Sequence, residues 1–375
     1  MKLGLSRRQL LRDSTALLAG MAISESGFGA LPTSTSDLSL KQIAAQRGIL
    51  YGAEAVFEEL HDDKEFAALF VEQCGILTPG VEAKWADVEP EDGEFHFEHL
   101  DWMVDFAEKN GIKIRGHNLM WSVYNPAWAR AAVSLEGRGS EILQRHITTE
   151  VARYRGRISY WDVANEVTDP LYNPLDDGLV DSMWHRHVGP LAIDDAFKWT
   201  YAADPTPILF VNDDNLEYDS PDREEKRNTY LRLVETWLKR GVPITGFGLE
   251  SHLRPLKRID EKRYRRFLAE LAGMGLTIHI TELDIIDRDL PADIALRDKQ
   301  GADFCKRFLD IALDEPAVKA VITWGLSDRY TGMDGDPDVV RPDGLPSRCL
   351  PYDRDLKAKP MWHAIADALR HAPAR

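Results

Sequence analysis

Cysteine is scarce in this chain. The 375 residues include only 3 cysteines, Cys74, Cys305 and Cys349, which lie far apart in the sequence. Three scattered thiols are too few for a zinc site or a disulfide framework, and a single bridge would leave one thiol unpaired. We expect buried free cysteines that pack as small hydrophobic side chains, and we predict no chemical role for them.

Positive charge and long apolar runs are also in short supply. The formal net charge is −16 at pH 7, which repels phosphate backbones and anionic lipid headgroups. The apolar stretch at residues 16–23 is far shorter than the ~20 residues needed to span a bilayer. Nucleic acid and membranes are therefore poor candidate partners, whereas a neutral ligand remains compatible.

The first thirty residues resemble an export signal. Residues 6–12 (SRRQLLR) are similar to the twin-arginine motif, and the apolar stretch 16–23 is followed by small residues at 27–30. We predict a twin-arginine-type signal peptide at residues 1–30, a mature protein at 31–375, and a periplasmic or secreted location. The alternative is a short basic amphipathic helix at the start of a cytoplasmic protein.

Short apolar runs alternate with longer amphipathic segments along the rest of the chain, which is typical of βα units and a parallel sheet. Apolar residues make up 44% of the chain and charged residues 29%, as in a soluble globular enzyme. We predict strands at 48–53, 75–79, 113–119, 159–165, 208–212, 245–250, 276–282 and 320–325. Helices are predicted between them, among others at 100–110, 223–240, 261–274 and 298–314.

Eight strand–helix alternations without a repeat or a linker predict an α/β fold, a single-domain (β/α)8 TIM barrel. A doubly wound open sheet is the alternative. Polar side chains favour the barrel because they cluster at the ends of the predicted strands, which converge on one face where barrel active sites are built. They are His117, Asn118, Asn165, Glu166, Asn212, Asp213, His252, Glu282 and Asp284.

Two of these residues, Glu166 and Glu282, follow apolar strands in matching positions. Acetal cleavage needs one protonated carboxyl to assist the leaving group and one ionised carboxyl to attack the anomeric carbon. Either glutamate alone is more often a surface or salt-bridging residue, but the pair at matching strand ends favours catalysis. Asn165 is then placed to bind a sugar 2-hydroxyl. His252, oriented by Asp284, is placed to keep Glu282 ionised, unless it is only a satisfied polar residue at the rim.

Several ordered motifs make residues 45–368 similar to glycoside hydrolase family 10, whose best-known members are endo-β-1,4-xylanases. They include residues 115–121 (RGHNLMW), 161–166 (WDVANE), 248–253 (GLESHL) and 281–284 (TELD). The resemblance implies a retaining mechanism with Glu166 as acid/base and Glu282 as nucleophile. It also implies substrate contacts, with no metal and no cofactor, from Glu82, Lys84, His117, Trp121, Asn212, Glu250 and Trp324. Flat tryptophan faces with lysine, glutamate and histidine donors and acceptors suit a neutral polyol.

The sequence departs from the family pattern at sugar-binding positions. Gly80 and Val81 stand where Glu-Asn is usual, and residues 122–124 (SVY) replace His-Ser-Gln. Glu250 stands where glutamine is usual, and Gly332 where tryptophan is expected. We therefore expect intact bond-breaking chemistry with an altered choice of glycan.

The leading hypothesis is an endo-1,4-β-xylanase that acts as a monomer on a polysaccharide. The alternatives are hydrolysis of another β-glycan, such as a glucan or an exopolysaccharide, and a carbohydrate-binding barrel without turnover. A metal-dependent hydrolase has little support, because His185 and His187 are only two residues apart on a predicted loop or helix.

Overall fold

The computed structural model describes residues 38–135, 137–169, 175–335 and 337–375. The predicted signal peptide at 1–30 lies outside the described residues. Residues from Leu38 to Arg375 group into one compact unit.

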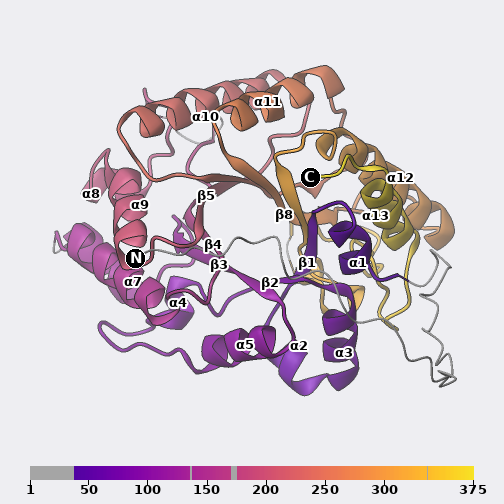
Figure 1. Ribbon diagram of the computed structural model, residues 1–375, viewed down its shortest axis with the longest axis horizontal. Helices are drawn as coiled ribbons and strands as arrows, with labels where there is room; N and C mark the ends of the chain where they lie inside the picture. The colour runs from indigo at the N-terminus through magenta and orange to yellow at the C-terminus, as the bar shows by residue number, and fades with distance from the viewer. Residues whose placement is uncertain (1–37, 136, 170–174, 336) are drawn as a thin grey trace, which may run out of the picture. The chain divides into compact units, whose positions relative to one another are not determined.

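Eight parallel strands form a closed barrel (Figure 1). The sheet runs in the order β6-β5-β4-β3-β2-β1-β9-β8, and β6 pairs with β8 to close the ring. A ninth, two-residue strand, β7, pairs only with the end of β8. The strands are β1 Leu50–Ala55, β2 Ile76–Pro79, β3 Lys113–Met120, β4 Tyr160–Asn165, β5 Ile208–Asp213, β6 Gly246–Leu249, β7 His252–Leu253, β8 Thr277–Ile285 and β9 Val318–Thr323. The predicted TIM barrel is confirmed, and the open-sheet alternative is wrong.

Helices surround the barrel (Figure 1). They are α1 Leu40–Ala45, α2 Phe57–Asp62, α3 Lys64–Gln73, α4 Trp85–Val88, α5 Glu98–Lys109, α6 Ala127–Leu135, α7 Gly139–Arg153, α8 Met183–His187, α9 Ala192–Ala203, α10 Pro221–Lys239, α11 Glu261–Gly273, α12 Ile294–Ala312 and α13 Pro360–His371. Two 3-10 turns, Asp328–Tyr330 and Gly332–Gly335, follow β9. The four helices predicted by name correspond to α5, α10, α11 and α12. Gly241 and Gly275 follow α10 and α11 with positive φ, where glycine closes a helix without steric cost.

The barrel interior changes from apolar to polar along the strands. Ile76, Tyr160 and Phe210 belong to a small buried apolar cluster. Beyond them, the buried Arg115 guanidinium donates from Nε to Asp162 Oδ2 at 2.8 Å and lies over the Phe210 ring. Every second residue of a strand points into the barrel, so the inward-pointing residues nearest the C-terminal strand ends lie at the barrel mouth. That polar layer is the floor of the candidate site.

Two further expectations concern the rest of the described chain. Cys74, Cys305 and Cys349 are free and buried, as predicted. Among the helices of residues 38–375 that the structure describes, none is long and apolar enough to cross a membrane.

Candidate active site

Glu166 lies immediately after β4 and is positioned by an unusual backbone conformation. Its φ is +49°, in the left-handed region that non-glycine residues seldom adopt outside constrained sites. Its N–H donates to the carbonyl of Asn212 at 2.9 Å, so the neighbouring strand β5 holds this turn in place. The strand therefore ends at Asn165, and the next side chain is fixed at the barrel mouth.

The half-buried carboxyl of Glu166 has one strong neutral donor. Trp121 Nε1 donates to Oε2 at 2.9 Å, and Asn165 Nδ2 lies 3.4 Å from Oε1. Burial raises the pKa of Glu166 to about 7, helped by the Asp214 and Glu282 carboxylates and opposed by the Trp121 hydrogen bond. Near neutral pH this group can therefore carry a proton and release it.

Glu282 lies within β8 and is surrounded by donors. Asn212 Nδ2 donates to Oε1 at 2.8 Å, His252 Nε2 lies 3.4 Å from Oε2, and His117 Nδ1 lies 3.9 Å from Oε1. Burial alone would raise the pKa of Glu282, but its neighbours His117, His252 and Lys84 outweigh it and lower the pKa to about 2. Glu282 is therefore an ionised carboxylate throughout the neutral range.

The two glutamates are connected through a pair of amides. Asn212 Nδ2 lies 2.9 Å from Asn165 Oδ1, so a polar chain runs from Glu166 through Asn165 and Asn212 to Glu282. Gly248 on β6 makes room for this arrangement, because a Cβ there would lie 2.1 Å from Asn212 Oδ1. Two carboxyls with pKa values pushed in opposite directions are typical of an acid paired with a nucleophile.

His252 bridges two carboxylates beside this chain. Its Nδ1 lies 2.9 Å from Asp284 Oδ2, while Nε2 faces Glu282. Burial lowers the pKa of His252, but Asp284 and Glu282 outweigh that effect and raise it well above the usual value. An imidazolium in this position donates from both nitrogens and holds Glu282 in one orientation.

Aromatic side chains and one lysine form a wall of the site. Lys84 Nζ lies 5.5 Å from the ring centroid of Trp121, and equally 5.5 Å from those of Tyr124 and Trp324. The His117 ring meets Trp324 edge-on at 5.3 Å, and its Nδ1 lies 3.0 Å from Asp162 Oδ2. The structure thus brings Lys84, His117, Trp121 and Trp324 together, as the sequence-based site requires, and adds Tyr124.

Glu82, which the resemblance implies as a substrate contact, accepts hydrogen bonds from main-chain amides in this structure. Its Oε1 accepts from Phe57 N at 2.5 Å and its Oε2 from Val81 N at 3.2 Å. The side chain is 5% exposed. In this structure Glu82 ties the segment after β1 to the segment after β2.

Sequence reasoning missed Glu54, which lies near the end of β1. A Cβ on Gly80 would lie 2.0 Å from Glu54 Oε1, so this carboxyl occupies the space that a side chain at position 80 would need. Burial raises the pKa of Glu54 to about 8, opposed by Lys84 and assisted by Glu82 and Glu282. The alternation of strand residues was the available signal: Glu54 is two residues beyond the inward-facing Gly52, so it is also expected to point into the barrel.

A cavity of about 680 Å³ opens beside the candidate catalytic residues. His252 and Trp324 line it together with Arg254, Leu256 and Asn215. Trp324 thus stands between the lysine side of the site and this larger space. The volume and the mixed apolar and polar lining are those of a site for an organic ligand.

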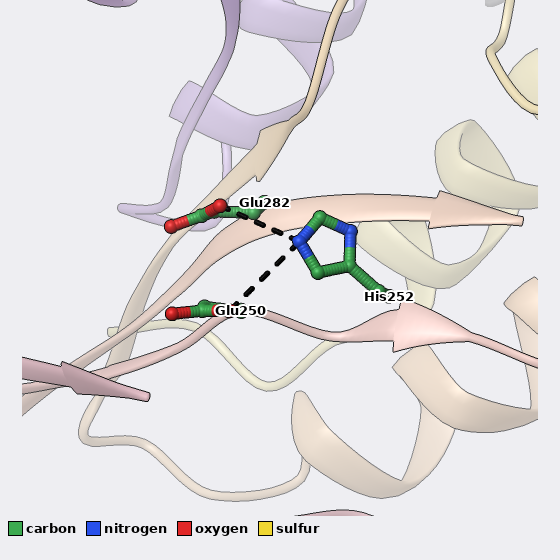
Figure 2. Close-up of side chains that lie close together, drawn as sticks. All are labelled: Glu250, His252 and Glu282. Atoms are coloured by element: carbon green, nitrogen blue, oxygen red, sulfur yellow. Dashed lines mark ion pairs between the residues drawn. The ribbon is translucent and has the colours of Figure 1, made fainter. Parts of the chain in front are cut away.

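Glu250, His252 and Glu282 bring single nitrogen or oxygen atoms within 4.8 Å of one another (Figure 2). This is the group of His and carboxylate side chains among the described residues whose spacing could admit a metal ion. A histidine must be a neutral imidazole to bind a metal. Asp284 and Glu282 instead raise the pKa of His252 and favour its protonated form. The cluster is therefore better suited to holding protons than to holding a cation.

Comparison with known proteins agrees with this geometry. The model of Glycosyl hydrolase family 10 matches residues 39–368. Endo-1,4-beta-xylanase B of Thermotoga neapolitana is 31% identical over 364 residues, which cover 96% of this chain and 98% of that protein.

Solved structures are similar over most of the chain. Native xylanase 10B from Thermotoga maritima has a TM-score of 0.79 at 31% identity, covering 88% of this chain and 98% of that one. Xylanase 10B from Thermotoga petrophila RKU-1, in complex with xylobiose, has a TM-score of 0.80 at 30% identity, covering 90% and 98%. By its family match and its relatives, the chain belongs to glycosyl hydrolase family 10 and is a xylanase-like O-glycosyl hydrolase.

Proposed function

We propose that this protein cleaves internal β-1,4 bonds of xylan or a closely related β-glycan with retention of anomeric configuration. The observation that carries the proposal is a pair of glutamates in one hydrogen-bonded chain whose pKa values are shifted in opposite directions, Glu166 upward and Glu282 downward. A protonated acid and an ionised nucleophile are the two groups that the first step of double displacement needs.

In the first step Glu282 attacks the anomeric carbon and forms a glycosyl ester. Glu166 gives its proton to the departing glycosidic oxygen, so that the bond to the leaving sugar breaks without releasing an alkoxide. Asn165, fixed by Asn212, is placed to bind the 2-hydroxyl, a contact that strengthens as the ring approaches an oxocarbenium ion.

In the second step water breaks the ester. Glu166, now ionised, takes a proton from the attacking water, and Glu282 leaves as a carboxylate. His252 and His117 stabilise that carboxylate in the free enzyme, which makes Glu282 a better leaving group. Two inversions at the anomeric carbon give net retention.

The xylan preference rests on the relatives named as endo-1,4-beta-xylanases and on the wall of Lys84 and aromatic rings. A second candidate, another β-glycan, is favoured by the departure from the family pattern at Gly80. There the carboxyl of Glu54 on β1 fills the space beside Gly80, the position where the family pattern has a glutamate. That change moves a polar group within the sugar-binding wall.

This function is tested by assaying purified wild type, Glu282→Ala and Glu166→Ala on xylan, glucan and mannan and measuring the sizes of the products. We expect xylan to be cut internally, with loss of about a thousandfold or more in Glu282→Ala and about 10²–10⁴-fold in Glu166→Ala. NMR should show a β-anomer as the first product. An initial α-anomer would contradict retention, and folded wild type that binds glycans without turning over any aryl β-glycoside would indicate a non-catalytic binding barrel.

We also propose that the protein is exported through residues 6–12 and acts outside the cytoplasm. The support is the twin-arginine-like motif with its apolar and small-residue segments. A polysaccharide too large to enter a cell has to be met outside it, which agrees with export of its hydrolase.

A further inference from the structure

A third carboxyl, that of Glu250, shares the hydrogen-bonding partners of Glu282. Glu250 directly follows β6, is 3% exposed, and has Oε1 at 3.1 Å from Asn212 Nδ2. Its Oε2 lies 3.9 Å from His252 Nε2, the same nitrogen that faces Glu282 (Figure 2). Asn212 and His252 are therefore placed between two buried carboxyls.

Both shared partners lie closer to Glu282. Asn212 Nδ2 is 2.8 Å from Glu282 against 3.1 Å from Glu250, and His252 Nε2 is 3.4 Å against 3.9 Å. His117 and Lys84 also lie near Glu282 and lower its pKa. Of the two carboxyls, Glu282 is thus the one whose negative charge is compensated.

The other charged groups around Glu250 are mostly acidic. Burial is the largest cause that raises the pKa of Glu250 well above its usual value, and the acidic groups of Glu282 on β8, Glu166 after β4, and Asp213 and Asp214 at the end of β5 raise it further. The nearby cation Lys226 is already bound to Asp213 at 2.6 Å and to Asp214 at 2.7 Å. Two ionised carboxylates in this buried space would lack the positive charge to hold them together.

We propose that Glu250 carries a proton in the working enzyme and acts as a positioning residue that leaves Asn212 and His252 to Glu282. A protonated carboxyl offers an acceptor oxygen and one O–H donor, so like the glutamine usual at this position in the family it can both accept and donate a hydrogen bond. The neutral oxygen Oε1 is a weaker acceptor for the Asn212 amide than the Glu282 carboxylate, which keeps the shorter contact, and the O–H on the other oxygen is available to a bound sugar hydroxyl. This inference rests on the proposed glycosidase function.

Loss of this proton should impair attack by Glu282. An ionised Glu250 competes for the Asn212 amide and the His252 imidazolium, and it no longer donates a hydrogen bond. The nucleophile then loses the contacts that orient it, although it stays charged. Glu250 therefore adds an alkaline limit to activity that is separate from the loss of the proton on Glu166.

The kcat/KM of a 2,4-dinitrophenyl β-xylobioside, measured from about pH 5 to about pH 10 with a chelator present, isolates this limit. The leaving group of this substrate is weakly basic and departs without acid catalysis. Because kcat/KM reports steps only up to the first irreversible one, its pH dependence does not reflect the proton on Glu166. We expect wild type to fall by about tenfold per pH unit above its inflection, and Glu250→Gln to stay flat. Glu217→Gln is the matched control, because Glu217 is another buried glutamate with a raised pKa, about 7, and should keep the wild-type inflection.

An infrared difference spectrum provides a readout that needs no turnover. The protonated-carboxyl C=O band at neutral pH should lose the signal of one carboxyl in Glu250→Gln, and only about half as much in Glu217→Gln because the pKa of Glu217 is about 7. A band unchanged in Glu250→Gln, or a wild-type profile without an alkaline fall, would overturn the inference even if the variant folds poorly. An inflection that persists in Glu250→Gln would also overturn it, whereas absence of any turnover by wild type would count against the proposed function.

Discussion

At the scale of single residues, the site depends on giving chemically identical carboxyls different protonation states. Glu166 is half-buried with a neutral tryptophan donor, whereas Glu282 is buried among cationic groups. Desolvation acts on both in the same direction, so the difference comes from the charges placed around each. The position of a carboxyl within the barrel mouth, more than its residue type, decides its role.

The pH dependence of hydrolysis of an unactivated xylo-oligosaccharide follows from these two residues. Activity needs ionised Glu282 and protonated Glu166, so it should rise through a pKa of about 2 and fall through one of about 7. We expect kcat/KM to drop about tenfold per pH unit above neutrality. The same measurement with Glu166→Gln should show low activity and no inflection near neutral pH; an unchanged inflection would assign it to another group.

At the scale of elements, β6 must pass close to β5 for the polar chain to form. Gly248 on β6 is the register partner of Asn212 on β5, and a Cβ on Gly248 would displace the Asn212 amide. The amide contacts Asn165, Glu250 and Glu282 at once, so one added methyl disturbs all three contacts. The glycine in β6 is therefore required by side-chain packing across the strands.

We expect Gly248→Ala to lower the unfolding free energy by about 1–3 kcal/mol, as overpacked cores do, and to reduce kcat through the displaced Asn212. Denaturant unfolding and kcat measured on the same preparation check this. Gly273→Ala is the control, because that glycine ends α11 with nothing within 4 Å of an added Cβ, and alanine favours helix. Equal stability and activity in wild type and Gly248→Ala would contradict the account.

At the scale of the whole molecule, the single barrel gathers polar residues from distant strands onto one face. A net charge of −16 disfavours anionic partners and is compatible with a neutral glycan. The site is built from the ends of β1, β2, β3, β4, β5, β6, β8 and β9, so it exists only in the closed barrel. If the proposed twin-arginine signal is used, the barrel and its site would form before export.

Export through residues 6–12 is tested by replacing both arginines. In a bacterial host with a twin-arginine system, Arg7→Lys with Arg8→Lys should leave the enzyme in the cytoplasm while preserving its charge. Arg12→Lys, which lies outside the pair, should be exported like wild type. Activity and immunoblots of cytoplasmic and exported fractions give the result, and unchanged export of the double variant would count against the motif.

Most of the architecture and the two central glutamates could be predicted from the sequence. Strand and helix periodicity depends on local burial, so the eight strands and their order of alternation are legible in the chain. The predicted sixth strand, 245–250, was slightly too long: β6 ends at Leu249, and Ser251 with φ +66° separates it from β7. A positive φ at serine is not signalled by hydrophobic pattern.

The sequence by itself determined the barrel, the family motifs and the candidate carboxyl pair, because these rest on period, spacing and residue type. Only the tertiary structure decided that Glu82 binds main-chain amides, that Glu54 fills the space beside Gly80, and that Glu250 shares Asn212 and His252 with Glu282. Each of these depends on the register between strands that are far apart in the chain. Contacts across a closed barrel follow from how its strands are staggered, which no local pattern encodes.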